Sequence, residues 1–322
     1  MGKILQRCDV CKNFHVAFVV KDPETGEKIY LCSNCWKKRY GGQNAQESEQ
    51  NEAAPVEAME SKQTTDSLVN LPYPILEYDP APDAMIEPKR VIKPRDVPEH
   101  CVVCFFKEVL DKVVIEHQAR VLVDNKWEDG PHPLYEINYK DSRLAFFHPG
   151  VGGAISANLL VEVIAFGCQK FIVCGGCGVL EKGFAVGHLV VVSGAVRDEG
   201  VSYHYLPPNR EVKANPAGVS ALEAALRQQK VPYRVGKTWT TDAPYRETLA
   251  KIAARKAEGC LTVEMEAASM MAVAQFRGAV LGQVLYAGDD LSGRKWNERG
   301  WQHRKEIRES LFWLSAEACL RL

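Results

Sequence analysis

The chain has 322 residues, of which 46% are hydrophobic, and it carries 40 Lys and Arg against 41 Asp and Glu. This length supplies enough apolar side chains for one large or two modest domains, and the neutral balance argues against a general nucleic-acid-binding surface, which needs excess cations. No apolar run reaches the about 18 residues that a membrane span needs, and the first residues do not resemble a signal peptide, so we expect a cytoplasmic protein without membrane contact.

Charge divides the chain into three parts. Residues 1–40 hold eight Lys and Arg against four Asp and Glu, a net charge of +4, whereas residues 41–70 hold one lysine against six acidic residues, a net of −5. The second part has no aromatic residue, and such a segment cannot bury enough apolar area to offset the entropy of ordering it. We therefore predict a small head over 1–40, a flexible acidic linker over 41–70 and a large domain over 71–322.

Two pairs of cysteines in the head predict a structural zinc site. Cys8 and Cys11 form one Cys-x2-Cys pair and Cys32 and Cys35 form a second, with twenty residues between the pairs. This spacing is typical of a four-thiolate zinc ribbon, in which metal binding folds a unit too small to hold itself together by burial. Strands over 15–20 and 28–31 would form a hairpin between the pairs. The basic residues 37–39 leave contact with nucleic acid or protein open, although a solvated basic flank is the commoner explanation.

Short apolar runs alternate with helical patterns along the rest of the chain. Strands are predicted over 101–106, 144–147, 171–174, 188–193 and 280–287, and helices over 108–114, 155–166, 214–229, 262–276 and 304–320. This alternation is typical of an α/β layer fold with a largely parallel, buried sheet. The seven cysteines outside the head fall in this part, and most of them are expected to be buried thiols.

Glycines and carboxylates gather after several of the predicted strands. HPGVGG (148–153) and GGCG (175–178) each follow a strand, and Gly288, Asp289 and Asp290 follow the last one. Ligands of α/β sheets bind at strand ends, where glycine lets the backbone approach closely. Glu264 and Glu266 add two carboxylates at the start of a predicted helix. A cluster of acids with few lysines favours hydroxyl binding and proton donation, as in glycosidic chemistry.

These segments resemble the nucleoside phosphorylase family, which includes uridine phosphorylase, purine nucleoside phosphorylase and the methylthioadenosine nucleosidases. The resemblance rests on the paired glycine segments HPGVGG (148–153) and CGGCGVL (174–180), on RDEGVSYHY (197–205), on TDAPY (241–245) and on VEMEAA (263–268). The match runs from about Val91 to the C-terminus in the family's order and spacing. It implies a catalytic domain over 71–322 with a single-domain α/β/α fold and a mixed central sheet.

The resemblance also assigns substrate-binding roles to single residues. Glu266 would bind the 2′- and 3′-hydroxyls of ribose, Met265 would back the sugar, and Glu264 would support Glu266. Tyr245 would pack against the base. The backbone at the glycine turns would approach the substrate, at Gly152, Gly175 and Gly176.

Asp289 falls where purine-type members keep an acidic residue that protonates the leaving base, and its neighbour Asp290 is the second candidate. A departing purine anion is a poor leaving group, so a general acid lowers the barrier. Pyrimidine-type members carry Asn-Arg in this region instead. The resemblance therefore favours a purine nucleoside as substrate.

The sequence departs from the phosphate-using members at two places. Val173 stands where they bind phosphate with an arginine, and the segment 104–109 lacks their phosphate loop, which ends in arginine. The hydrolytic members place a glutamate before the valine of the first helix, and Glu108 precedes Val109 here. Glu108 would then activate water, although a glutamate on a surface helix is also ordinary. The pattern favours hydrolysis, with Lys107 or an unassigned arginine left open as a phosphate ligand.

We therefore predict an enzyme that cleaves the N-glycosidic bond of a nucleoside and, by resemblance, forms at least a homodimer. Phosphorolysis with phosphate as second substrate is the nearest alternative. A nucleoside-sensing protein that is not an enzyme and signals through the zinc head is the alternative from another class. Arg197 and Asp198 are expected to form an ion pair that supports their loop.

Overall fold

The computed structural model describes Phe18–Lys21, Lys28–Leu31, Leu68 and residues 71–322. The chain divides into two compact units, Met1–Gln63 and Thr64–Leu322. In the first unit, β1 (Phe18–Lys21) and β2 (Lys28–Leu31) pair antiparallel, in agreement with the predicted hairpin. The four predicted zinc ligands, Cys8, Cys11, Cys32 and Cys35, lie outside the described residues, as does the predicted linker apart from Leu68.

The second unit is built on a ten-stranded sheet with the order β11-β10-β8-β12-β7-β3-β6-β5-β4, in which β9 pairs with β8. Its strands are β3 (His100–Cys104), β4 (Arg120–Trp127), β5 (Gly130–Tyr139), β6 (Ser142–Phe147), β7 (Lys170–Val179), β8 (Leu189–Asp198), β9 (Glu211–Lys213), β10 (Tyr233–Thr241), β11 (Cys260–Glu264) and β12 (Val280–Asp290). Its α-helices are α2 (Pro88–Val91), α3 (Lys107–Glu116), α4 (Gly153–Phe166), α5 (Pro216–Gln228), α6 (Leu249–Ala257), α7 (Ala267–Arg277) and α8 (Lys305–Cys319). Short 3₁₀ turns are η1 (Pro74–Leu76), η2 (Val201–His204), η3 (Pro244–Arg246) and η4 (Trp301–His303).

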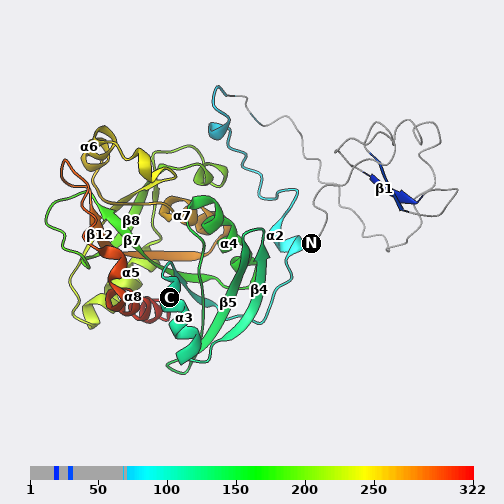
Figure 1. Cartoon of the computed structure of the whole chain (residues 1–322), viewed down its shortest axis with the longest axis horizontal. Coiled ribbons are helices and arrows are strands. Elements are labelled where there is room, and N and C mark those ends of the chain that lie inside the picture. The colour runs from blue at the N-terminus through cyan, green and yellow to red at the C-terminus, as the bar shows by residue number, and fades with distance from the viewer. Residues whose placement is uncertain (1–17, 22–27, 32–67, 69–70) are drawn as a thin grey trace. The chain divides into compact units, whose positions relative to one another are not determined.

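Helices cover both faces of this sheet. α4 and α7 pack side by side, and their buried residues form one hydrophobic cluster with the sheet (Figure 1). α3, α5 and α8 contribute to a second cluster, which holds Val102, Phe146 and Ile172 of neighbouring strands. Because side chains alternate between the faces of a strand, these two clusters are the two faces of one sheet. The predicted α/β/α fold with a mixed central sheet is confirmed.

Antiparallel pairs are more frequent than the strand–helix alternation predicts. β3, β6, β7 and β12 pair in parallel, as do β8, β10 and β11, but β12 pairs antiparallel with β8. β11 also pairs antiparallel with β7, at Val263 opposite Gly178. The strands β7, β12, β8, β10 and β11 therefore form a closed ring of pairings.

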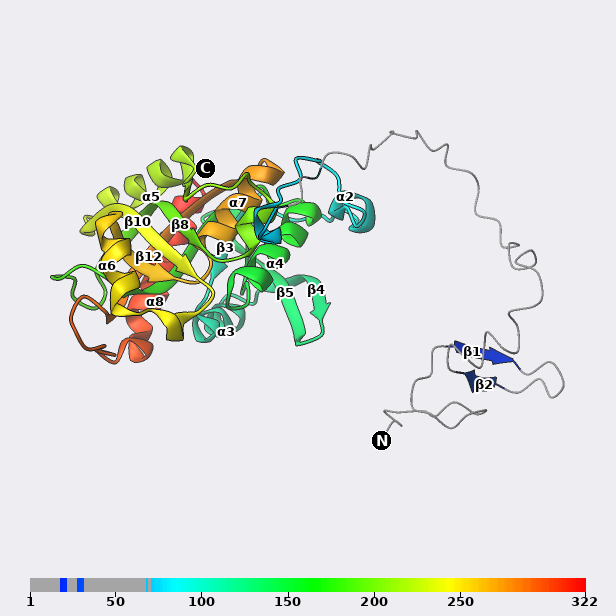
Figure 2. The ribbon, with the colours of Figure 1, turned by 90° about the horizontal axis from the view of Figure 1, so that it is seen from above.

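The segment after residue 260 differs from the predicted helix over 262–276. Thr262 and Glu264 belong to β11, and the helix α7 starts only at Ala267, with Glu266 as the residue before it. Buried apolar runs of this length do not distinguish a strand from a helix by periodicity. The β4–β5 hairpin, β10 and α6 were not predicted. The hairpin is half exposed and forms the end of the sheet (Figure 2).

The described cysteines behave as core residues. The seven cysteines from Cys101 to Cys319 are free and buried, as predicted for most of them. Within the described ranges, no group of three or more His, Cys, Asp or Glu is arranged to hold a metal ion. The same part of the chain has no helix long and apolar enough to cross a membrane.

Candidate active site

Glu266 joins the starts of two helices. It precedes α7 and is 7% exposed, and its Oε1 accepts a hydrogen bond from the backbone N–H of Gly152, which precedes α4, at 2.6 Å. Its Oε2 accepts a second from the N–H of Met265 at 3.3 Å. Gly152 has a φ of +98°, which glycine adopts without strain. The two helix N-termini thus place positive partial charge around one carboxylate.

Glu264 holds the turn that presents Glu266. Its Oε2 accepts hydrogen bonds from the N–H groups of Glu266 and Ala267 at 2.8 and 2.7 Å. Its Oε1 accepts from the Thr240 hydroxyl at 2.7 Å, and the same hydroxyl oxygen accepts from the N–H of Ala268 at 3.0 Å. Glu264 thus fixes the backbone of this turn, and its supporting role in ribose binding stays a prediction.

Burial raises the pKa of both carboxyls in this motif. For Glu266 the loss of solvation comes first and the charge of Glu264 second, while the hydrogen bonds from Gly152 and Met265 oppose them. Burial also raises the pKa of Glu264, while the three hydrogen bonds that its carboxylate accepts lower it. Because Glu264 has more donors, Glu266 retains its proton to the higher pH. Hydroxyls that donate to Glu266 would favour its charged form.

Two further acidic residues lie next to this motif. Glu199 is 6% exposed and accepts hydrogen bonds from the N–H of Ser202 at 3.0 Å and from the hydroxyl of Ser269, in α7, at 2.5 Å. Asp242 accepts from the N–H of Gly200 at 2.9 Å, and burial with the nearby charge of Glu199 raises its pKa. Both residues lie in segments that carry the family resemblance, but their partners are distant in sequence and could not be read from it.

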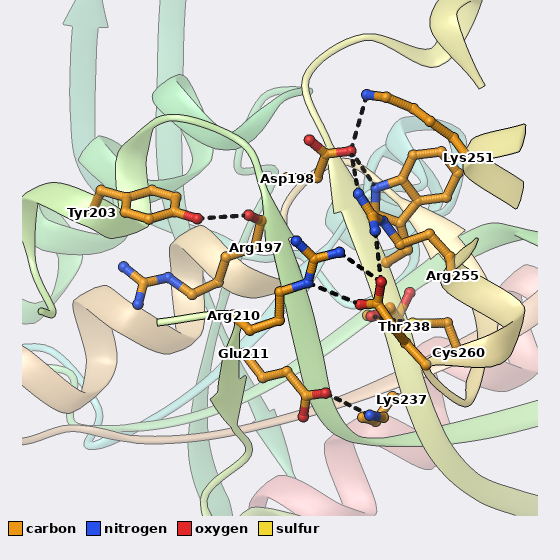
Figure 3. Close-up of polar contacts among 12 residues, drawn as sticks. Arg197, Asp198, Tyr203, Arg210, Glu211, Lys237, Thr238, Lys251, Arg255 and Cys260 are labelled. Carbon is orange, nitrogen blue, oxygen red and sulfur yellow. Dashed lines mark hydrogen bonds and ion pairs between the residues drawn. The ribbon is translucent and has the colours of Figure 1, made fainter. Parts of the chain in front are cut away.

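The predicted ion pair between Arg197 and Asp198 is wrong. Asp198 accepts hydrogen bonds from Lys251 and Arg255 at 3.1 and 3.2 Å, whereas the Arg197 guanidinium lies 4.3 Å from the Tyr203 ring (Figure 3). That guanidinium also donates to two backbone carbonyls of the following loop. Successive side chains of a strand point to opposite faces, so the two neighbours contact different elements.

Asp289 and Asp290 end β12 with different partners. Asp290 accepts a hydrogen bond from the N–H of Ser292 at 2.8 Å, and its backbone pairs with Asn297. Asp290 therefore caps the loop that follows the strand. Asp289 Oδ2 accepts from Trp296 Nε1 at 2.7 Å. Its carboxylate is thus held by a side chain rather than by the backbone, and its role as the acid stays a prediction.

Gly178 lies close to both Asp289 and Val263. A Cβ on Gly178 would lie 2.9 Å from Val263 Cγ1 and 3.5 Å from Asp289 Oδ1. Val263 directly precedes Glu264. Asp289 and the residue that precedes the predicted ribose motif therefore both lie close to one glycine.

Glu247 is an acidic residue of this region that the sequence analysis missed. It follows η3, and burial together with the charge of Asp289 raises its pKa to about 7. Tyr245, two residues earlier, has a fully exposed side chain. A single glutamate just beyond the base-side motif carries no signal of its own, so only the structure reveals that it approaches Asp289.

The glycines at the end of β7 have aromatic neighbours. A Cβ on Gly175 would lie 3.2 Å from Phe105, and one on Gly176 would lie 3.2 Å from Tyr286 and 3.3 Å from Trp301. A larger side chain at either position would press against these rings, so packing alone explains why both residues are glycine. Their predicted contact with substrate stays a prediction.

Glu108 is held by an arginine from the last helix. Its Oε1 accepts a hydrogen bond from Arg308 Nη1 at 2.6 Å, and Arg308 Nε donates to the Tyr286 hydroxyl at 3.1 Å. Among the described residues, no hydrogen bond or ion pair joins Glu108 to Glu266 or Asp289. Arg308 thus places a guanidinium beside the β3–α3 connection, and whether it or Lys107 binds phosphate stays open.

A cavity of about 580 Å³ lies elsewhere in this unit. It is lined by parts of the segment 79–92, by α4, by the end of η2 and by the end of α7, and none of the predicted site residues borders it. The candidate site therefore rests on the carboxylates and glycines described above.

Known proteins share this fold. The solved structure of AMP nucleosidase from Bacteroides thetaiotaomicron superposes with a TM-score of 0.57 at 19% identity, over 69% of this chain and 87% of that one. Uridine phosphorylase from Vibrio fischeri superposes with a TM-score of 0.60 at 19% identity, over 72% of this chain and 95% of that one. At this identity the likeness shows the fold alone.

Sequence relatives point to the same family. The chain is 26% identical to guanosine phosphorylase of Halorubrum lacusprofundi over 178 residues, which are 55% of this chain and 73% of the relative. It is 32% identical to uridine phosphorylase of Thermococcus kodakarensis over 107 residues, which span 33% of this chain and 39% of the relative. The sequence profile of the Phosphorylase superfamily matches residues 100–311. The predicted class, enzymes that cleave the N-glycosidic bond of nucleosides, is confirmed at the level of the family: the chain belongs to the Phosphorylase superfamily.

Proposed function

We propose that the protein cleaves the N-glycosidic bond of a purine nucleoside, with Glu266 as the ribose ligand and Asp289 as the general acid. The observation that carries this proposal is the position of Glu266, buried between the N–H of Gly152 and the turn held by Glu264. A relative named guanosine phosphorylase supports a purine, as does the acid predicted at Asp289, whereas a relative named uridine phosphorylase points to a pyrimidine.

Glu266 would act through the ribose hydroxyls. As the bond between C1′ and the base breaks, positive charge develops on the sugar ring. Hydrogen bonds from the 2′- and 3′-hydroxyls to a buried carboxylate strengthen as that charge grows, so they stabilise the transition state more than the ground state. Met265, next to Glu266, would pack against the sugar.

Asp289 would supply the proton for the leaving base. The electron pair of the C1′–N bond moves to the base nitrogen, which takes the proton from the carboxyl group. A departing purine then leaves neutral rather than as an anion. Glu247 lies close enough for the two charges to interact, which places a second carboxyl beside the proposed acid.

Hydrolysis is favoured over phosphorolysis. In hydrolysis Glu108 would take a proton from water, and the water oxygen would bond to C1′ to give free ribose. In phosphorolysis a phosphate oxygen would attack C1′ instead. The absence of arginine at Val173 supports hydrolysis, whereas Arg308 beside Glu108 favours the alternative, because a guanidinium suits phosphate.

The full-length chain, incubated with adenosine, guanosine, inosine and uridine with and without phosphate, tests this proposal. We expect release of a purine base that does not depend on phosphate and that is lost in Glu266→Gln and Asp289→Asn. Strict phosphate dependence would exclude the hydrolase. If Arg308→Met then abolished the phosphate-dependent release of base, Arg308 would be identified as the phosphate ligand. Nucleoside binding without turnover, unchanged by Asp289→Asn, would favour the sensor. The homo-oligomer, the cytoplasmic location and the zinc head remain predictions.

A further inference from the structure

Trp296 is a large aromatic residue left in solvent next to the proposed acid. Its side chain is 63% exposed, and its indole Nε1 donates a hydrogen bond to Asp289 Oδ2 at 2.7 Å. Tryptophan combines an apolar ring with a single polar N–H group. The contact here is a hydrogen bond to a carboxylate.

The fold fixes the segment that carries Trp296. On one side of it, the backbone of Asn297 pairs with that of Asp290 through hydrogen bonds of 2.8 and 3.0 Å. The guanidinium of Arg299 donates to the carbonyl groups of Phe184 and Gly288. Trp296 therefore belongs to a connection anchored to the end of β12, and its approach to Asp289 follows from that anchoring.

The indole N–H can only donate a hydrogen bond, never accept one. A protonated carboxyl group carries its proton on one oxygen, and the other oxygen is an acceptor. Because Oδ2 accepts from the indole N–H, and the carbonyl oxygen of a protonated carboxyl is its better acceptor, this hydrogen bond favours the form that carries the proton on Oδ1. Oδ1 is the oxygen that faces Gly178, at 3.5 Å from where a Cβ would stand.

We propose that Trp296 is the positioning residue of the acid, which keeps the transferable proton of Asp289 on Oδ1. This inference rests on the proposed function of Asp289. When the C1′–N bond breaks, its electron pair moves to the base nitrogen, which takes the proton from Oδ1. The carboxylate that remains keeps the hydrogen bond from Trp296, which stabilises the ionised form.

Trp296→Phe tests the inference, because it keeps an aromatic ring and removes the N–H group. We expect kcat for purine release to fall about tenfold, less than the roughly hundredfold or more that a complete general acid contributes, because the acid itself is kept, with KM changed by less than about threefold. The alkaline limb of the kcat/KM profile should move to higher pH, because the ionised form has lost a donor. An equal loss at every pH, or no loss, would overturn the inference.

Trp313→Phe is the matched control. Trp313 lies in α8 and packs on Tyr139, with ring centroids 5.2 Å apart. The substitution Trp313→Phe should therefore leave both kcat and the alkaline limb of the pH profile unchanged. Asp289→Asn separates the two proposals. If Asp289→Asn retains activity, the proposed acid is wrong. If Asp289→Asn abolishes activity and Trp296→Phe leaves the alkaline limb of the kcat/KM profile unchanged, only the inference about Trp296 fails.

A measurement without turnover completes the test. The indole N–H resonance of Trp296, assigned by its absence in Trp296→Phe, should shift with pH in the parent protein as the facing carboxyl titrates. It should lose that shift in Asp289→Asn. A resonance that behaves alike in both proteins would overturn the inference even if no substrate were found.

Discussion

The backbone N–H of Gly152 and the carboxylate Oε1 of Glu266 lie 2.6 Å apart. These residues are 114 positions apart in the sequence, and each directly precedes a helix, α4 or α7, that packs against the other. One hydrogen bond thus connects the glycine turn after β6 with the turn after β11. The carboxylate proposed to bind ribose is oriented before any substrate arrives.

Glu266→Gln should lower kcat/KM by at least about a hundredfold, because a neutral amide stabilises the charge on the sugar far less than a carboxylate does. The amide oxygen can still accept from Gly152, so the thermal unfolding temperature should change little. Glu181→Gln, at an exposed pair with Arg234, is the control. Equal activity of the two variants would exclude Glu266 as the ribose ligand.

The stability of the protein should depend on pH through the same residue. The folded-state pKa of Glu266 is raised by burial, so the folded state binds this proton more tightly than the unfolded state. Its contribution is complete below the ordinary glutamate pKa of about 4.3 and is lost as pH rises through the raised value. Urea unfolding of the parent and Glu266→Gln should therefore diverge, with the variant losing less stability as pH rises. Parallel curves would contradict this reading.

Glu247 should titrate at lower pH in Asp289→Asn. Burial is the first cause of its pKa of about 7, and the negative charge of Asp289 is the second. The variant removes that charge and leaves the burial, so the ionised form of Glu247 becomes easier to form. Carboxyl resonances of ¹³C-labelled glutamate, with Glu247→Gln for assignment, measure the shift. An unchanged midpoint would mean that the two carboxyls do not interact.

Asp198→Asn should destabilise the protein by about 1–3 kcal/mol, the range for a buried charged group that loses its partner. Asp198 contacts Arg255, which is 8% exposed and has a buried Nε without a hydrogen-bond partner. Asp124→Asn, at an exposed pair with Lys126, should cost less than about 0.5 kcal/mol. Urea unfolding measures the free energy of unfolding of both variants. Equal losses of stability would contradict the expected difference between the partly buried Asp198 and the exposed Asp124.

The full-length chain should contain about one zinc ion per polypeptide, as expected for a single four-thiolate site. Cys8→Ser combined with Cys11→Ser should abolish binding, measured by elemental analysis after metal-free washing. The described part of the catalytic unit holds no metal-ligand cluster, so nucleoside cleavage should survive this change. Parent protein without zinc would exclude the four-thiolate site.

Local signals in the sequence were sufficient where the chemistry lies within a few residues. Glu264, Met265 and Glu266 were recognised as one motif, and their hydrogen bonds are indeed made largely within that turn. The glycine turn at Gly152 was likewise predicted, because glycines that follow a strand allow a sharp turn, and the structure gives Gly152 a positive φ. An α/β layer fold followed from the alternation of apolar runs and helical periods, whereas the α/β/α arrangement with a mixed sheet came from the family resemblance.

Contacts between distant segments could not be predicted in this way. Glu247 approaches Asp289 across more than forty residues, and Glu108 meets Arg308 across 200. The hairpin over 120–139 lies at the sheet's end and is half exposed, so its strands lack the continuous apolar run that marked β3 and β7. The predicted ion pair between Arg197 and Asp198 failed for the opposite reason. The two residues are neighbours in a strand, and successive side chains of a strand point to opposite faces.

The pairing of β11 with β7 closes five strands into a ring. None of those five strands can separate from the sheet without breaking pairings on both of its sides, so they should exchange their amide hydrogens together, in the slowest cooperative unit of the protein. Glu264, Asp289 and Gly178 are in that unit, whereas the β4–β5 hairpin at the other end is not. The proposed catalytic groups should therefore remain in register during fluctuations that open the far edge of the sheet.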